Sequence, residues 1–213
     1  TQDTLSATNT VTGDWNTLRD GGNVQINNHG ITSSPAAVAA VKQISGRTII
    51  YGINRAFFEF DTSSITHIPK NASLSIKGID YGNADMACCR GYWSSAPYWG
   101  GIDGYSHGGS DGSGAGDQSS NIIYYANTIT SWSTSGYNNI TLRQQALVDI
   151  AGNTEFKVAL LEATHDLLDI EPTYPGDTDN KSGLITVDAA GTISDPKLKL
   201  TTQDDSVFFG ANF

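Results

Sequence analysis

Alternation of apolar and polar positions is the clearest pattern along the chain, and it predicts β-strands. The segment 54–61 (NRAFFEFD) places Ala56, Phe58 and Phe60 on one apolar face, with Arg55, Phe57 and Glu59 between them. The segment 72–81 (ASLSIKGIDY) alternates in the same way. Shorter runs bounded by turn residues predict further strands at 4–11, 22–27, 47–53, 121–129, 155–162, 184–187 and 196–201.

Helical spacing is clear in only one segment, 141–150 (TLRQQALVDI), where apolar residues recur on one face. We expect Thr141 to cap the start of this helix and Gly152 its end. The alanine-rich segment 33–41 (SSPAAVAAV) predicts either a short helix or a loop.

Many short strands with turns between them and a single short helix near 141–151 favour an all-β fold. We expect an antiparallel two-sheet β-sandwich of jelly-roll type, formed by residues 1–203. Residues 204–213 form an apolar tail, which either adds to the domain's own sheet or docks on a neighbouring subunit by strand addition. The tail residues proposed for assembly are Val207, Phe208, Phe209 and Phe213.

The composition points to a soluble surface protein. The formal net charge is −10, and only 16% of the residues are charged. Because phosphate backbones and anionic membranes bind basic faces, we expect neither nucleic acid nor membrane insertion. No run of 18 apolar residues exists that could span a bilayer. The chain begins TQDTLSATNT without Met, as expected for a mature, processed or excised piece.

The two cysteines, Cys88 and Cys89, are neighbours in the sequence. On a strand their side chains point to opposite faces, and adjacent residues reach disulfide geometry only with strain. We therefore exclude a disulfide framework and expect one buried thiol and one that lies under a loop. The alternatives are a strained vicinal disulfide and an intermolecular bridge.

The order of several motifs resembles a known family. The segment 54–65 (NRAFFEFDTSSI) followed by 72–76 (ASLSI) is similar to the core of DNRLRE-type domains, jelly-roll β-sandwiches related to carbohydrate-binding module family 96. Downstream, 129–142, 156–161, 164–169 (THDLLD) and 191–198 (GTISDPKL) follow the family order. The resemblance covers roughly residues 4–202, and its motifs are specific in their order rather than singly.

The resemblance implies a binding or scaffolding role, because such domains occur in secreted surface proteins, polysaccharide-degrading systems and phage structural proteins. It also places Trp132 in the core and gives Arg55 a structural role, either paired with a carboxylate or stacked on a neighbour. The glycine-rich segment 100–116 and the FFGANF tail depart from the family pattern.

Aromatic residues in the polar segment 93–121 are candidates for a glycan platform, since rigid rings cover the apolar faces of sugars. Alternatively, these rings form a small core of their own loop. The candidates are Trp93, Tyr98, Trp99 and Tyr105.

Carboxylates in two loops suit Ca²⁺, which takes several oxygen ligands from flexible segments. The alternative is a solvated loop or, next to His165, a turn fixed by bonds from His165 or Asp166 to backbone N–H groups. Calcium is the one cofactor that the sequence suggests. The candidate ligands are Asp103, Asp111, Asp117, Asp166 and Asp169.

We find no catalytic triad or zinc motif in the sequence and expect a protein that is not an enzyme. The predicted function is that of a structural protein on an extracellular or virion surface, as a phage or capsid decoration, spike or fibre subunit. Its partners would be neighbouring subunits and glycans. The alternative is a carbohydrate-binding module of a secreted polysaccharide-active protein.

Overall fold

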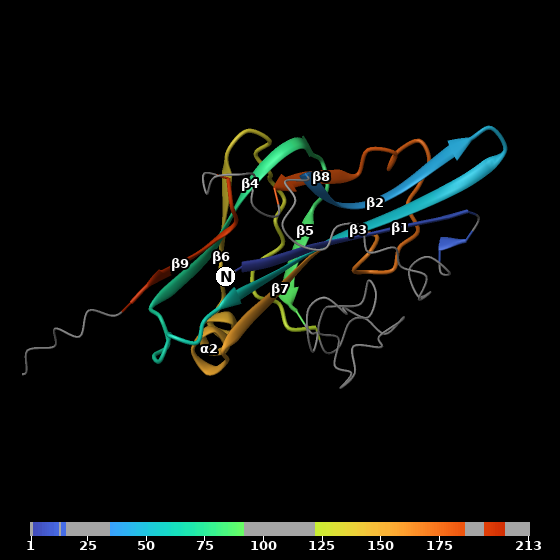
Figure 1. Cartoon of the computed structure of the whole chain (residues 1–213). Coiled ribbons are helices and arrows are strands. Elements are labelled where there is room, and N and C mark those ends of the chain that lie inside the picture. The colour runs from blue at the N-terminus through green and yellow to red at the C-terminus, as the bar shows by residue number, and fades with distance from the viewer. Residues whose placement is uncertain (1, 13, 16–34, 92–121, 186–193, 203–213) are drawn as a thin grey trace, which may run out of the picture.

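Long antiparallel strands make up most of the chain. The computed structural model describes residues 2–12, 14, 15, 35–91, 122–185 and 194–202 (Figure 1). Its elements are β1 (Gln2–Thr12), β2 (Pro35–Ser45), β3 (Thr48–Asp61), β4 (Asn71–Gly82), β5 (Met86–Arg90), β6 (Tyr137–Thr141), α2 (Gln144–Gly152), β7 (Glu155–Glu162), β8 (Lys181–Ile185) and β9 (Lys197–Thr201).

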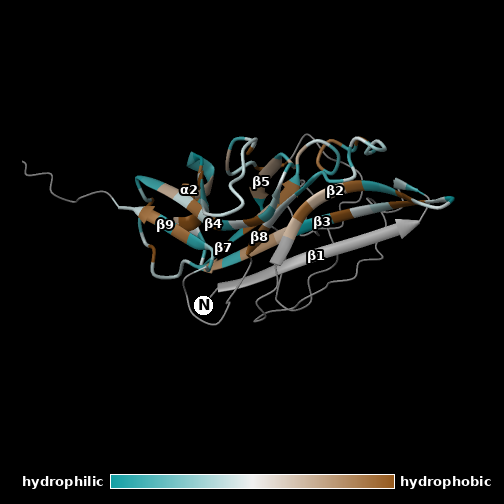
Figure 2. Ribbon diagram, turned by 90° about the horizontal axis from the view of Figure 1, so that it is seen from above, coloured by the Kyte–Doolittle hydropathy of each residue, from teal (hydrophilic) through white to brown (hydrophobic). Residues whose placement is uncertain are grey.

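The 14-residue strand β3 organises one half of the molecule. On one edge it pairs with the whole of β1, and its other edge is shared by β2 and β7. The strand β5 adds to β7. Figure 2 shows β1 and β2 running beside β3 along the elongated sheet.

The other half is built on β4, which pairs with β6 and β9 along Asn71–Lys77 and with β8 beyond Gly78. Since β8 also pairs with β2, the hydrogen-bonded ladder is continuous from β5 to β6. The predicted all-β fold with one short helix is therefore confirmed. The strands form a single curled antiparallel sheet, and the expected division into two separate sheets is not confirmed.

The main core lies inside the curl. Ala56, Phe58 and Phe60 of β3 face Leu74 and Ile76 of β4 there. The helix α2 closes this core with Ala146, Leu147 and Ile150.

The opposite face of β3 is also buried, which the sequence pattern did not predict. Phe57 and Arg55 are fully buried, and Phe57 packs with Ala87 and Cys89 in a second cluster. Cys88 lies in the main core, so the two free thiols point to opposite faces as expected. Burial raises the pKa of Cys88 to about 12.

Glycines allow the two halves to join at β4 and β8. A Cβ on Gly183 would lie 2.2 Å from the carbonyl oxygen of Ile79, and one on Gly78 would lie 1.9 Å from that of Ser133. The indole of Trp132 donates to the Gly183 carbonyl at 2.8 Å. Trp132 is thus a core residue, as its place in the family-like segment implied.

Several predicted boundaries are wrong. Residues 35–45, expected within a helix or loop, form β2, because the small side chains of Val38, Ala39 and Ala40 fit between β3 and β8. Thr141 ends β6 instead of capping α2, whose N-cap is Arg143. The C-cap of the helix is Asn153, not Gly152, which is the last helical residue.

Two other expected strands have different outcomes. The segment 121–129 contributes isolated bridges to β5 rather than a strand. The strand expected at 22–27 lies outside the described residues.

Candidate functional site

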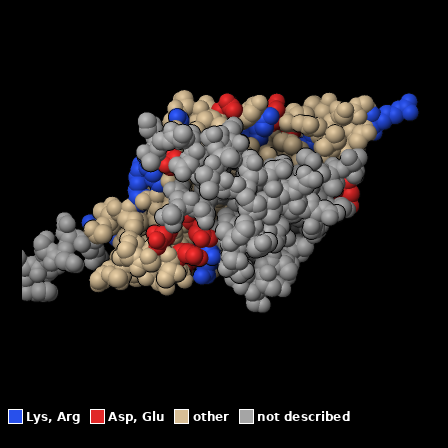
Figure 3. Space-filling model, in the orientation of Figure 1, with Lys and Arg blue, Asp and Glu red and all other residues tan. Residues whose placement is uncertain are grey.

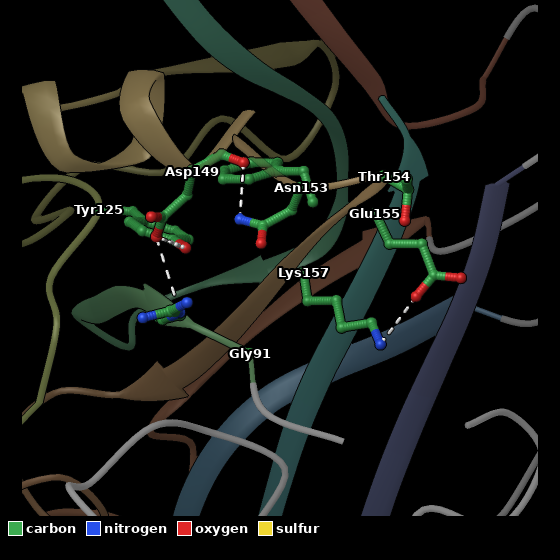
Figure 4. A pocket seen from close by; sticks show the side chains of 9 residues that line it. Gly91, Tyr125, Asp149, Asn153, Thr154, Glu155 and Lys157 are labelled. Carbon is green, nitrogen blue, oxygen red and sulfur yellow. Dashed lines mark hydrogen bonds and ion pairs between the residues drawn. The ribbon is translucent and has the colours of Figure 1, made fainter. Parts of the chain in front are cut away.

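A pocket of about 260 Å³ opens where β5, β7 and the end of α2 meet (Figure 4). Its wall is mostly polar and includes two cations and two carboxylates. The lining residues are Arg90, Gly91, Tyr125, Asp149, Asn153, Thr154, Glu155, Phe156 and Lys157.

Asp149 is the most enclosed charged group of the pocket, with 7% exposure. Its Oδ2 accepts a 2.6 Å hydrogen bond from the Tyr125 hydroxyl and lies 3.6 Å from Arg90 Nε. Its Oδ1 accepts a bond from Gln145 at 3.1 Å. Burial and the bond to Asp149 raise the pKa of Tyr125, so its hydroxyl remains a donor.

The opposite wall carries a second set of paired charges. The Lys157 ammonium lies 2.9 Å from Glu155 and 3.7 Å from Glu59. In Figure 4 the side chains of Glu155 and Lys157 point toward one another, across the pocket from Tyr125 and Asp149. Both cations of the pocket are therefore close to carboxylates.

Hydrogen bonds to backbone carbonyls connect the elements around the pocket. The Asn153 amide donates to the Asp149 carbonyl at 2.8 Å, which ties the pocket to the end of α2. The Thr62 hydroxyl donates to the Asn153 carbonyl, and the Gly91 N–H donates to the Lys157 carbonyl. A ligand would meet groups that are already in place, so little ordering would oppose binding.

A buried ion pair lies on the face of β3 that carries Phe57. Arg55 and Asp166 are fully buried, and Arg55 Nε donates to Asp166 Oδ2 at 2.7 Å while the second guanidinium nitrogen bonds Oδ1. Pairing with a carboxylate, one of the two expected roles of Arg55, is thus confirmed. Both oxygens of Asp166, a proposed calcium ligand, accept hydrogen bonds from Arg55.

The turn that follows β7 is fixed by Glu162, which the sequence reasoning missed. Its carboxylate accepts from the backbone N–H groups of Thr164, His165 and Asp166. The sequence predicts this role for His165 or Asp166. A Glu two to four residues before the turn is the signal that points to Glu162 instead.

Asp169, another proposed calcium ligand, is exposed and accepts a hydrogen bond from the Trp15 indole at 3.3 Å. Asp103, Asp111 and Asp117 lie outside the described residues. Over the ranges that the structure describes, no group of three or more His, Cys, Asp or Glu could hold a metal ion. Calcium binding stays a prediction.

The acidic segment 164–180 is tied to β2 and β3 by charged groups. Glu171 accepts from the Lys42 ammonium at 2.6 Å and from the Tyr51 hydroxyl. These two hydrogen bonds lower the pKa of Glu171. His165 lies with Nδ1 2.8 Å from the Ile170 carbonyl and Nε2 3.4 Å from Asp177.

A lysine face covers the outer side of β4, β6 and β9; we define it by Lys77, Lys197 and Lys199. Along β9 these lysines alternate with Leu198 and Leu200, which pack against the main core. In Figure 3, some Lys and Arg atoms lie on the side where β9 lies in Figure 1, and others lie along the top and at the opposite end. The alternation in KLKLT was the sequence signal for this face.

The glycan candidates Trp93, Tyr98, Trp99 and Tyr105 lie outside the described residues. So do the tail residues Val207, Phe208, Phe209 and Phe213, so the sequence predictions for both groups stay predictions.

A scan against protein-family models and a search of curated proteins both find no match. The resemblance to DNRLRE-type domains therefore stays a prediction. No helix in the described ranges is long and apolar enough to cross a membrane.

Proposed function

We propose that this chain is a non-catalytic binding subunit of an extracellular or virion surface, and that it holds an uncharged glycan in the pocket between β5, β7 and α2. The observation that carries this proposal is the pocket itself, a polar cavity of about 260 Å³ whose charged groups are arranged in pairs.

Charge balance favours a neutral ligand. Arg90 and Lys157 offer donors, but Asp149 and Glu155 stand beside them, so an anion would meet carboxylates as well as cations. A sugar hydroxyl both donates and accepts, and it therefore matches a wall of mixed donors and acceptors. Because Asp149 and Glu155 are both engaged with cations, they suit binding better than proton transfer.

The aromatic candidates belong to the same proposal through the sequence. Trp93 follows Gly91, which lines the pocket, by two residues. Rings of this kind would add stacking on the apolar face of a sugar to the hydrogen bonds of the pocket.

The test is a glycan array with the full chain, followed by calorimetric titration of the glycans that bind. Glu155→Gln and Arg90→Gln each remove a charge from the pocket wall and should weaken binding about tenfold, the value of one charged hydrogen bond. Asp179→Asn removes an exposed charge that does not line the pocket, and it should leave affinity unchanged. Equal affinity of all three variants, or no binding on the array, would contradict the proposal.

A further inference from the structure

The lysine face has a regular geometry. Lys197 and Lys199 are alternate residues of β9, and Lys197 pairs with Ser75, two residues before Lys77 on β4. Alternate residues on a strand and diagonal neighbours across strands are each about 7 Å apart. The three cations therefore form a row on the outer side of the sheet.

The partners of this row are uncharged. Lys197 lies over the Tyr137 ring at 4.8 Å, Lys199 donates to the Asn139 amide oxygen at 3.0 Å, and Lys77 donates to the Ser194 hydroxyl at 3.1 Å. In the part of the chain that the structure describes, no carboxylate lies within ion-pair distance of the three. They carry positive charge in a chain whose net charge is −10.

Protection of a sheet edge does not account for the whole row. Lysines on an edge strand discourage unwanted strand pairing, and β9 pairs only with β4 in the described sheet. That explanation fits Lys197 and Lys199. It does not fit Lys77, because β4 has partners on both of its edges.

Exposed carboxylates lie at the far end of the molecule. Glu171 and Asp179, which we call the acidic end, have side chains that are 52% and 70% exposed, although each also pairs with a lysine of its own chain, Lys42 at 2.6 Å and Lys181 at 3.2 Å. Their segment is attached to β2 and β3 near the β2–β3 turn, whereas β9 extends from the opposite end in both ribbon views (Figures 1 and 2).

We propose that the lysine face binds the acidic end of a second copy of this chain, in a head-to-tail contact. Both surfaces belong to every chain, their charges are opposite, and they lie at opposite ends. Such a heterologous contact leaves one free surface of each kind, so it can continue into a ring or a filament. The inference concerns assembly and does not depend on the glycan pocket.

The overall negative charge sets the conditions for this contact. Two chains of charge −10 repel each other at long range, and the repulsion is screened beyond a Debye length of about 8 Å at 0.15 M salt. Opposite charges in direct contact are screened less. Association should therefore be strongest near physiological salt and weaken both at very low and at high salt.

Sedimentation of the full chain up to about 1 mM, a range that detects weak contacts, tests the proposal. The wild type should show concentration-dependent association. Lys197→Glu with Lys199→Glu should raise the dissociation constant at least about tenfold. Asp179→Lys with Glu171→Gln should do the same from the other side. Arg47→Glu, in the β2–β3 turn, is the charge control and should not weaken association.

A mixture separates a specific contact from damage to the fold. The two charge-changed variants should associate with each other better than either does alone, because the altered charges face one another across the new contact. A monomeric wild type, or a mixture that associates no better than its components, overturns the proposal. If the monomeric wild type instead binds dextran sulfate through the lysines, the occupant is an anionic polymer and the proposal is also overturned.

Discussion

The pocket and the lysine face differ in the groups that surround their cations. In the pocket, Arg90 lies 3.6 Å from Asp149, and Lys157 lies 2.9 Å from Glu155. On the lysine face, Lys77, Lys197 and Lys199 contact a hydroxyl, an aromatic ring and an amide. The difference indicates that the pocket suits uncharged ligands and that the lysine face suits an anionic partner.

A cation in a third environment, the buried interior, completes the comparison. Arg55 is fully buried and donates two hydrogen bonds to the Asp166 carboxylate. A charge removed from water needs a partner, whereas an exposed lysine remains solvated without one. The cost of removing a cation should therefore fall from Arg55 to Lys157 to Lys199.

The largest effect is expected for Arg55→Met, which leaves Asp166 buried without its cation. Breaking a buried pair by removing one partner costs about 3–5 kcal/mol. Urea denaturation of the variant and the wild type measures the loss. The double variant Arg55→Met, Asp166→Leu should recover part of it, and a double variant less stable than Arg55→Met would show that the pair is not the cause.

Gly183→Ala should disrupt the pairing of β8 with β4, which joins the two halves of the sheet. The added Cβ would lie 2.2 Å from the Ile79 carbonyl oxygen, and forcing a group into such a packed place costs about 1–3 kcal/mol. Gly152 at the end of α2 has nothing within 4 Å, so Gly152→Ala is the matched control. It should gain up to about 1 kcal/mol from helix propensity. Thermal unfolding followed by circular dichroism compares the two, and equal melting temperatures would refute the packing argument.

Acid should weaken the paired charges while the lysine face is unaffected. Hydrogen bonds from Lys42 and Tyr51 lower the pKa of Glu171 below 4.5, so its stabilisation is present above that pH. The contribution is lost as the pH falls through the lowered folded-state pKa. The stability difference between wild type and Glu171→Gln, measured by urea unfolding from pH 6 to about pH 3, should shrink as pH falls. A difference that grows on acidification would contradict this linkage.

Much of the fold could be predicted from alternation alone. The strand 155–162 was predicted with its observed bounds, because its apolar centre and polar ends are local features. The strand β2 was missed, since alanines have no strand preference of their own and are placed there by β3 and β8.

The candidate sites were harder to predict than the strands. Arg90 is far in the sequence from Asp149 and Lys157, and it joins them only through the pairing of β5 with β7 and the packing of α2. The sequence makes Asp166 and Asp169 calcium candidates, because it does not show that Arg55 binds both carboxylate oxygens of Asp166.

The smallest expected effects compare one lysine from each region. Lys157→Gln removes contacts with Glu155 and Glu59 and should cost about 0.5–1 kcal/mol, the upper range for partly exposed pairs. Lys199→Gln removes only a bond to an exposed amide and should change stability by less than about 0.5 kcal/mol in either direction. Denaturation in urea at low and at high salt measures both, and added salt should reduce the cost only for Lys157→Gln. If Lys199→Gln proved the more costly, the lysine face would stabilise the fold of the single chain. Its lysines would then not be available to bind a partner.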